Sequence, residues 1–194
     1  MLQTVTLKLT GSSLICHNGQ TADPRNRFSK ALKAISGKRK KVDSDLEELA
    51  RLEFLAGLYL EGGDIVLPSH VLESSLIAGA KKSKRGTQAK TAIFIENASS
   101  LDFDGKPEVI NEEVLTELFE AGEHSLSIGV KVGTARVIRT RPHLRNWSTT
   151  VRVDFEDEFV NRAEVIDFAT DAGRQVGLCD WRPKHGRFAV EVVA

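Results

Sequence analysis

Apolar and polar residues alternate along several short stretches of the chain, a pattern typical of strands with one buried face. Valine and leucine alternate with threonine and lysine over residues 2–10. Residues 91–96, which are apolar over 92–95, resemble a buried strand. The alternating pattern returns in the C-terminal half, at residues 126–132, 135–140, 147–155 and 188–192.

Helical periodicity marks four other segments. The capping box Ser44-x-x-Glu47 predicts the start of one helix, and Asn161-x-x-Glu164 predicts the start of another, which Gly177 closes. The two remaining predicted helices cover residues 69–82 and 111–120. Residues 11–42 show only a weak helical pattern near 28–35, so we expect a long loop there.

The strongest elements follow the order strand, helix, strand, strand, helix, strand. This βαββαβ order predicts an α+β protein with a ferredoxin-like core of the RRM or RAMP type. Residues 69–82 would form its first helix. We expect a single domain over residues 1–194, with large insertions at about 11–62 and 97–121.

Composition excludes several classes of protein. Hydrophobic residues make up 41% and charged residues 28% of the 194 residues, so a wholly disordered chain is not expected. No apolar run reaches the roughly 20 residues of a membrane span, and no signal peptide is recognised. The two cysteines, Cys16 and Cys179, provide neither a disulfide framework nor paired zinc ligands. We therefore expect a cytoplasmic protein without a membrane partner.

The net charge of zero conceals a strong segregation of charge. Three runs contain basic residues and no acid: eight in residues 25–41, five in 74–95 and six in 124–153. The acidic residues gather at 43–53, 96–123 and 154–171. Such segregation creates local fields that a net count does not reveal. Each run is also compatible with an ordinary solvated loop or helix face.

Two stretches resemble the RAMP superfamily, the RNA-binding subunits that form the backbone of CRISPR effector complexes. One is the helix entry Leu67–Lys81, which contains Pro68-Ser69 and Ser74-Ser75-Leu76, and the other is the loop Gly177–Phe188. Residues 17–24 and the run SGKRKK are similar to small proteins of tailed bacteriophages. The resemblance implies a ferredoxin-like fold that binds the RNA backbone, in a phage protein acting in the host cytoplasm.

The basic runs and the C-terminal loop supply the predicted nucleic-acid-binding residues. Lysine and arginine would neutralise phosphates, and Trp181 would add a stacking surface beside its basic neighbours. Arg145 next to Trp147 offers a second such pair, although the phase of Trp147 with Val151 favours a core position. The residues predicted to bind are Lys38, Arg39, Lys40, Lys41, Lys81, Lys82, Lys84, Arg85, Arg139, Arg141, Arg145, Trp181, Arg182, Lys184 and Arg187.

Motifs for catalysis, metals or cofactors are not recognised in the sequence. The histidines are scattered, and SGKRKK lacks the upstream glycine of a phosphate-binding P-loop. We therefore predict no catalytic residue, no metal and no cofactor. Through the RAMP resemblance, His17 or His185 is an alternative candidate for a general acid or base in metal-independent RNA cleavage.

Taken together, the sequence predicts a non-enzymatic protein that binds RNA or single-stranded nucleic acid through its backbone. It would multimerise along the strand, as a homo-oligomer or larger nucleoprotein assembly, and protect phage nucleic acid or interfere with host defence. One alternative is a virion or assembly protein that multimerises by matching acidic segments to basic ones. A second alternative is a metal-independent ribonuclease.

Overall fold

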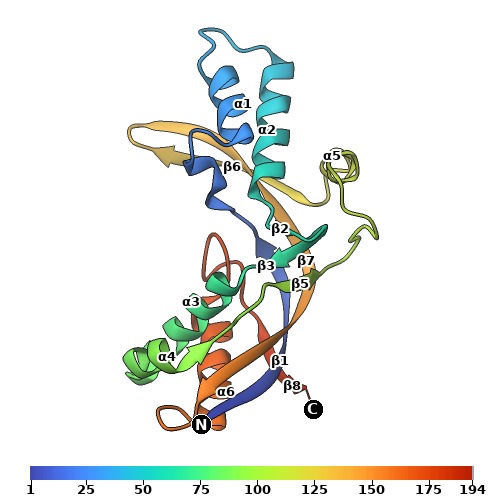
Figure 1. Ribbon diagram of the computed structural model, residues 1–194. Helices are drawn as coiled ribbons and strands as arrows, with labels where there is room; N and C mark the ends of the chain where they lie inside the picture. The colour runs from blue at the N-terminus through green and yellow to red at the C-terminus, as the bar shows by residue number, and fades with distance from the viewer. Residues whose placement is uncertain (194) are drawn as a thin grey trace. The chain divides into compact units, whose positions relative to one another are not determined.

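The computed structural model describes residues 1–193, with the backbone alone at residue 132. Within this range the protein is α+β, with six α-helices and an antiparallel sheet of eight strands (Figure 1). This confirms the predicted fold class. No helix in the described range is long and apolar enough to cross a membrane.

The chain divides into two compact units, each built from segments that are far apart in the sequence. Unit 1 contains Met1–Ile15, Leu60–Lys106 and the chain from Leu144 onward. Unit 2 contains Cys16–Tyr59 and Pro107–His143. The two stretches of unit 2 lie near the expected insertions at 11–62 and 97–121, but the second continues through the strands predicted at 126–140.

Unit 1 contains most of the sheet. Its strands follow the spatial order β2-β3-β5-β7-β1-β8, and β4 pairs with β7 beside β5. Leu7 of β1 lies opposite Val192 of β8, and Leu101 of β5 lies opposite Thr149 of β7. The strands are β1 (Leu2–Ile15), β2 (Leu60–Glu61), β3 (Asp64–Leu67), β4 (Ile93–Phe94), β5 (Ser99–Asp102), β7 (Ala135–Glu156, shared with unit 2) and β8 (Ala189–Val193).

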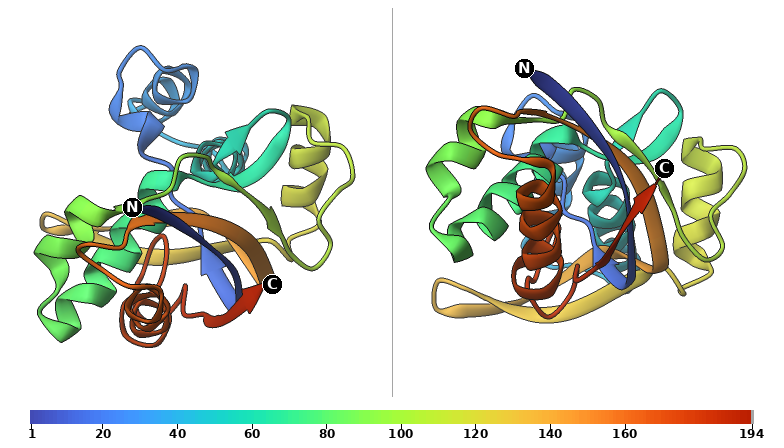
Figure 2. Two further views of the ribbon diagram at one scale, coloured as in Figure 1. Left: turned by 60° about the horizontal axis from the view of Figure 1, so that its bottom comes forward. Right: turned by 90° about the horizontal axis from the view of Figure 1, so that it is seen from below.

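The helices of unit 1 cover one face of this sheet (Figure 2). They are α3 (Ser69–Ala80), α4 (Gly86–Ala92) and α6 (Arg162–Asp171), the last of which continues as a π-helical turn over Ala172–Val176. Helix α3 follows β3 and leads through α4 to β4 and β5, and α6 connects β7 to β8. The strand order β5-β7-β1-β8 with these two helices is compatible with the ferredoxin-like core, which stays a prediction.

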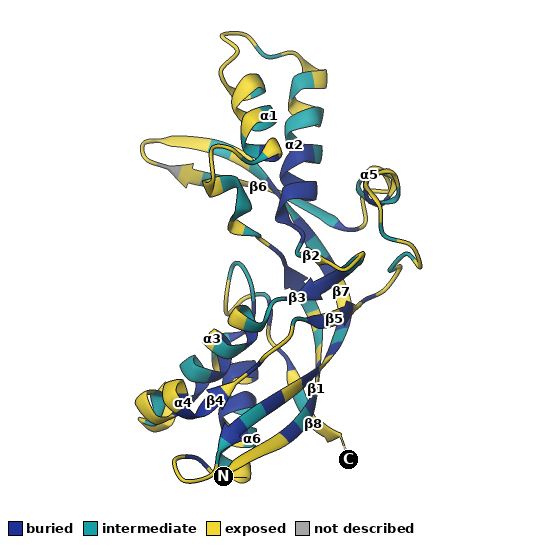
Figure 3. Cartoon of the chain, in the orientation of Figure 1, coloured by how far each residue is buried: buried dark blue, intermediate teal, exposed yellow. Residues whose placement is uncertain are grey.

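The core of unit 1 lies between the helices and the sheet. Leu7 and Leu9 of β1 are fully buried, as are Leu72 and Leu76 of α3, whereas Lys8 of β1 is exposed. The burial pattern along β1 and β7 therefore follows the alternation read from the sequence (Figure 3). One face of the sheet is packed, and the other carries mainly polar side chains.

Unit 2 is built on a helix pair and a hairpin. Its elements are α1 (Arg27–Ser36), α2 (Asp43–Gly57), α5 (Glu112–Glu120), the 3₁₀ turn Gly19–Ala22, and β6 (Ser125–Val132) paired with the first part of β7. Glu53 of α2 is only 9% exposed and joins the helix to the hairpin. Its carboxylate accepts hydrogen bonds from the Thr140 amide at 2.7 Å and from Arg139 Nη1 at 2.5 Å.

Several predicted elements are wrong in detail. The expected loop at 11–42 contains the end of β1 and all of α1, because Asn26 caps that helix through the Phe28 amide. Helix α2 begins after Val42, whose amide donates to Asp45, so the Ser44 box does not form its cap. The segment 91–96 is mostly the end of α4 and the short β4, and the insertion expected at 97–121 begins with β5 of the main sheet.

The two strands predicted at 135–140 and 147–155 are one strand, β7, of 22 residues. Asn146 interrupts the alternation because it has a left-handed backbone with φ of 46°. As a result both Arg145 and Asn146 face solvent, and the buried phase resumes at Trp147. A local bulge thus keeps a single strand continuous while it changes the face that its side chains present.

Helices α3 and α6 approach so closely that Gly79 has no room for a side chain. A Cβ atom on Gly79 would lie 2.1 Å from the Phe168 carbonyl oxygen and 2.8 Å from the Ala172 amide nitrogen. We predict that Gly79→Ala lowers the free energy of unfolding by about 1–3 kcal/mol, measured by urea denaturation. Alanine's better helix propensity, about 1 kcal/mol, would be outweighed by a clash with rigid backbone.

The matched control is Gly129→Ala in β6, where the nearest atom to an added Cβ is Ile138 Cδ1 at 4.0 Å. This variant is expected to unfold at the same urea concentration as the wild type or slightly above it. Equal stability of both variants would contradict the close packing of α3 on α6.

Candidate nucleic-acid interface

A group of exposed lysines surrounds a hollow in unit 1, where α3 ends and α4 begins. Lys81, Lys84 and Lys90 line this hollow, whose volume is about 670 Å³, and Lys82 is exposed next to it. We call these four residues the lysine cluster. Among the described residues none of the four forms an ion pair, so their charges are available to an anion.

The backbone explains why these lysines gather. Lys84 has a left-handed conformation, with φ of 62°, and the Arg85 amide donates to the Ala80 carbonyl oxygen at 2.9 Å. This turn ends α3 and reverses the chain into α4, which returns Lys90 toward the same hollow. Gly86 allows the stem of Lys81 to lie against the turn, since a Cβ there would be 2.4 Å from Lys81 Cγ.

Arg85, predicted to bind nucleic acid, has a structural role at this turn. Its Nη1 lies 2.7 Å from Glu164 Oε1, and its Nη2 donates to the Phe159 carbonyl oxygen at 2.7 Å. Phe159 lies just before α6, and Glu164 lies in its first turn. The guanidinium therefore ties the α3–α4 turn to the N-terminal end of α6 instead of extending into solvent with the lysines.

The loop between α6 and β8 is folded tightly against β1. The Gly186 amide donates to the Ser13 carbonyl oxygen at 2.8 Å, and the Asp180 amide donates to that of Ile15 at 2.9 Å. Cys179 and Trp181 both have positive φ, at 61° and 52°. Two strained non-glycine residues so close together, held by contacts elsewhere, are common in segments that serve a function.

The predicted basic residues of this loop are exposed. Trp181 is half-buried, with its ring centroid 6.3 Å from that of His185, while Arg182 and Lys184 extend into solvent. Arg187 lines a separate hollow of about 650 Å³ with Arg174, which the sequence analysis did not select. The loop thus carries a half-buried indole and the exposed cations Arg182 and Lys184, whose binding role stays a prediction.

The lysine cluster and the C-terminal loop lie at opposite ends of the α3–α6 pair. Ser75, in the middle of α3, donates to the Gly177 carbonyl oxygen at 3.0 Å, whereas Arg85, past its end, contacts Glu164. The helices are therefore antiparallel, and the length of α6 separates the two regions. The two basic groups of unit 1 form separate surfaces.

The basic run 38–41 forms the connection between α1 and α2 in unit 2. Lys38 Nζ lies 2.6 Å from Asp45 Oδ1, and Lys41 Nζ donates to the Lys38 carbonyl oxygen at 3.3 Å. The bond from Lys38, followed by that from the Val42 amide, lowers the pKa of Asp45. Lys38 therefore supports the start of α2, while Arg39 and Lys40 are fully exposed.

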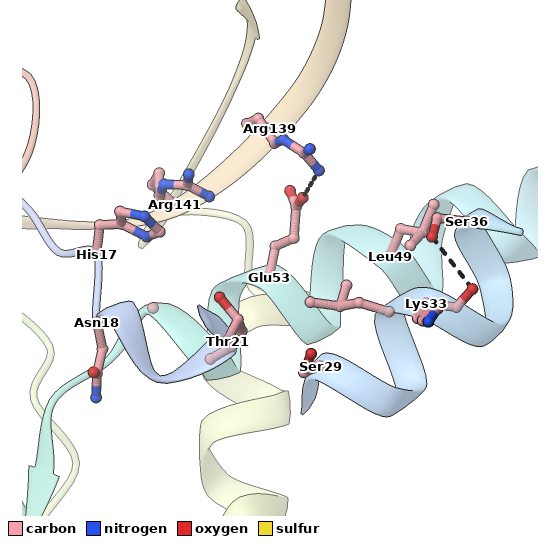
Figure 4. A pocket seen from close by; sticks show the side chains of 13 residues that line it. His17, Asn18, Thr21, Ser29, Lys33, Ser36, Leu49, Glu53, Arg139 and Arg141 are labelled. Atoms are coloured by element: carbon pink, nitrogen blue, oxygen red, sulfur yellow. Dashed lines mark hydrogen bonds and ion pairs between the residues drawn. The ribbon is translucent and has the colours of Figure 1, made fainter. Parts of the chain in front are cut away.

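Arg139 and Arg141 line a cavity of about 380 Å³ that lies entirely within unit 2 (Figure 4). The two arginines project from β7 toward α1 and α2, and Glu53 accepts the hydrogen bond from Arg139. His17 and Arg141 both line this cavity. These arginines therefore line a partly open pocket between the hairpin and the helices of unit 2.

Trp147 is a core residue, as its phase along the strand predicted. It is 1% exposed, and its ring packs edge-on against Phe188 with centroids 6.2 Å apart. The pairing of Arg145 with Trp147 as a stacking platform is wrong, because the bulge at Asn146 turns Arg145 outward while the indole is buried. Arg145 remains exposed on β7.

Three residues of these sites were not selected from the sequence. Lys90 lies in the second acid-free run, so its charge was visible, but its return toward Lys81 depends on the turn at Lys84. Arg174 sits in a predicted helix with no local signal of a site. Glu53 reads as an ordinary helical glutamate, and only the tertiary contact with Thr140 marks it as buried.

No protein-family model matches this sequence, and no curated protein matches it as a relative. The similarity to RAMP proteins therefore stays a prediction carried by the short motifs at 67–81 and 177–188. In the part of the chain that the structure describes, no three histidine, cysteine, aspartate or glutamate side chains are grouped to hold a metal ion.

His185 is expected to titrate below its ordinary pKa of 6.5. Partial burial, and to a lesser degree the positive charge of Lys184, lower the pKa of the imidazole. Because the unfolded chain then binds more protons, the protein should lose stability as pH falls from 6.5 toward the folded-state pKa. Following the imidazole protons by NMR in wild type and Lys184→Ala tests this.

The substitution should raise the pKa of His185 only part of the way to 6.5, because burial is the larger cause. A wild-type midpoint at or above 6.5 would contradict the partly buried position of the ring against Ser13.

Proposed function

We propose that this protein binds RNA or single-stranded nucleic acid through phosphate contacts made by the lysine cluster of unit 1. The observation that carries the proposal is the convergence of Lys81, Lys84 and Lys90 on one hollow without a carboxylate partner in the described range. Like charges held this close repel one another, and a polyanion relieves that repulsion while releasing its own counterions.

The C-terminal loop is proposed as a second contact on the same unit. Arg182 and Lys184 supply charge, and the half-buried Trp181 offers an indole face on which a base can stack. A strand that follows the helix layer would meet the lysine cluster at one end and this loop at the other. Such binding does not depend on base sequence, because none of these contacts reads a base edge.

We further propose that unit 1 is a ferredoxin-like core of the RAMP type, on two grounds. The strand order and the two helical connections are compatible with it. The motifs at 67–81 and 177–188 fall on the entry to α3 and on the strained loop before β8. Among the described strands, Phe94 of β4 is the one large aromatic that is exposed, at 44%. A single exposed ring offers little surface for base stacking on the sheet, so we place binding on the loops and helix ends.

The first test is charge reversal of the lysine cluster. The variant Lys81→Glu/Lys84→Glu/Lys90→Glu should bind a fluorescein-labelled oligo(U) at least about tenfold more weakly in fluorescence anisotropy, because each lost phosphate contact also removes counterion release. The slope of log K against log salt should become shallower by about 2, since three contacts of about 0.7 each disappear.

The matched control reverses three exposed lysines outside the predicted sites, Lys8, Lys30 and Lys131. It changes the net charge equally and should retain the salt slope of the wild type. Equal losses in both variants, or failure of the wild type to bind at low salt, would refute the lysine cluster as the site. A wild type free of nucleic acid that runs as a large assembly would instead favour the virion or assembly role.

A second candidate function, metal-independent RNA cleavage, is favoured by one contact. Ser13 Oγ lies 2.8 Å from His185 Nδ1, within the strained loop and next to exposed cations. In this reaction neutral His185 would take the proton of a ribose 2′-hydroxyl, which attacks the adjacent phosphorus. The bond from phosphorus to the 5′ oxygen breaks, and that oxygen takes the proton back from the His185 imidazolium, so the products are a 2′,3′-cyclic phosphate and a 5′-hydroxyl.

Incubating end-labelled RNA with the protein in excess EDTA tests this second candidate. Cleavage should depend on the 2′-hydroxyl, so a DNA of the same sequence stays intact, and His185→Ala should abolish cleavage without weakening binding. Unchanged cleavage by His185→Ala would assign the activity to another group, and absence of cleavage by the wild type would leave binding as the only function.

A further inference from the structure

The cavity of unit 2 has the features of a site for a small anionic molecule. Three cations line it, Lys33 from α1 and Arg139 and Arg141 from β7, against a single carboxylate, that of Glu53. With His17 neutral, the lining therefore carries a net charge of +2. A cavity of about 380 Å³ falls in the size range of small-molecule pockets.

Glu53 neutralises only part of this charge, because its two oxygens are committed to the hairpin. One accepts from Arg139 Nη1 and the other from the Thr140 amide. A guanidinium has five N–H donors, so Arg139 retains donors that it does not give to Glu53. The buried carboxylate thus fixes the position of this arginine, which is the arrangement that pre-organises a cation for a ligand.

The geometry of β7 places the two arginines side by side. Residues 139 and 141 are two apart in a strand, so their side chains leave the same face of the hairpin. Guanidinium groups present planar, forked donors that match the oxygens of a phosphate. Lys33 reaches the cavity from the facing helix as a point charge.

The rest of the lining suits the body of a larger molecule. Hydroxyl groups of Thr21, Ser29 and Ser36 and the side chains of Leu32 and Leu49 complete the wall (Figure 4). A volume of 380 Å³ corresponds to about a dozen water molecules at roughly 30 Å³ each, more than inorganic phosphate alone would displace. The site therefore has room for an organic group attached to the anion.

We propose that unit 2 binds a small phosphate ester in this cavity, with its phosphate between Arg139 and Arg141 and its organic part toward Leu32 and Leu49. The site is separate from the lysine cluster, because all of its lining residues belong to unit 2. It can therefore be tested independently of nucleic-acid binding by unit 1.

Isothermal titration calorimetry of the full chain with adenosine 5′-monophosphate is the primary experiment. Saturable binding at one site is expected, with adenosine showing none and inorganic phosphate binding more weakly than the nucleotide. Arg141→Gln and Lys33→Gln should each weaken binding of the nucleotide about 10- to 100-fold, the range typical of a lost charge-assisted hydrogen bond.

The matched control is Lys30→Gln, an exposed lysine of α1 that does not line the cavity. It removes the same charge and should change the affinity by less than about twofold. Lys33→Gln alters an exposed helical side chain, so it keeps the test valid if Arg141→Gln fails to fold. No saturable binding of the nucleotide up to 10 mM in the wild type, or equal losses in Lys30→Gln and Lys33→Gln, would overturn the proposal.

The cluster variant Lys81→Glu/Lys84→Glu/Lys90→Glu distinguishes the two sites. It should bind the nucleotide with wild-type affinity while it loses affinity for oligo(U). Loss of both affinities in this variant would mean that the nucleotide binds at the lysine cluster, and the cavity assignment would be wrong.

Discussion

The close approach of α3 to α6 is the constraint on which the candidate interface depends. Gly79 permits it, because any side chain there would meet the backbone of Phe168 and Ala172. With the two helices antiparallel and in contact, the end of α3 must lie at the start of α6, and the loop that follows α6 must lie near the start of α3. The two basic groups of unit 1 are separated for this reason, and each occupies one end of the helix layer.

Ion pairing divides the basic residues into those that hold the fold and those available to a ligand. Arg85 joins the α3–α4 turn to α6, and Lys38 supports α2 through Asp45. Arg139 belongs to both groups, because it fixes the hairpin on α2 through Glu53 and keeps further N–H donors for a ligand. In the sequence, the basic residues of these pairs cannot be distinguished from the unpaired basic residues beside them. The lysines around the α3–α4 hollow, by contrast, have no carboxylate within reach in the described residues, which is why they carry the proposed function.

The two units offer different kinds of site. Unit 1 presents exposed cations on a turn and on a strained loop, a form suited to a long polyanion that binds from solvent. Unit 2 gathers its cations, together with hydroxyl and leucine side chains, around a partly open cavity of a size suited to a small molecule. Strand β7 contributes to both, since residues up to His143 belong to unit 2 and those from Leu144 belong to unit 1.

The sequence by itself determined the class of the protein and much of its local structure. The alternation in β1 and β7 and the capping box at Asn161 depend only on residues that are close in the sequence. Both could therefore be predicted without knowledge of the fold. The continuity of β7 could not be predicted in this way. The alternation breaks at Asn146, but the left-handed backbone of this one residue lets the strand continue on both sides of it. Tertiary structure alone decided which cations meet: the turn at Lys84 returns Lys90 to Lys81, and burial of Glu53 depends on the amide of Thr140, 87 residues away. Contacts between distant segments, which no local pattern encodes, thus separate the basic residues that can bind a ligand from those that stabilise the fold.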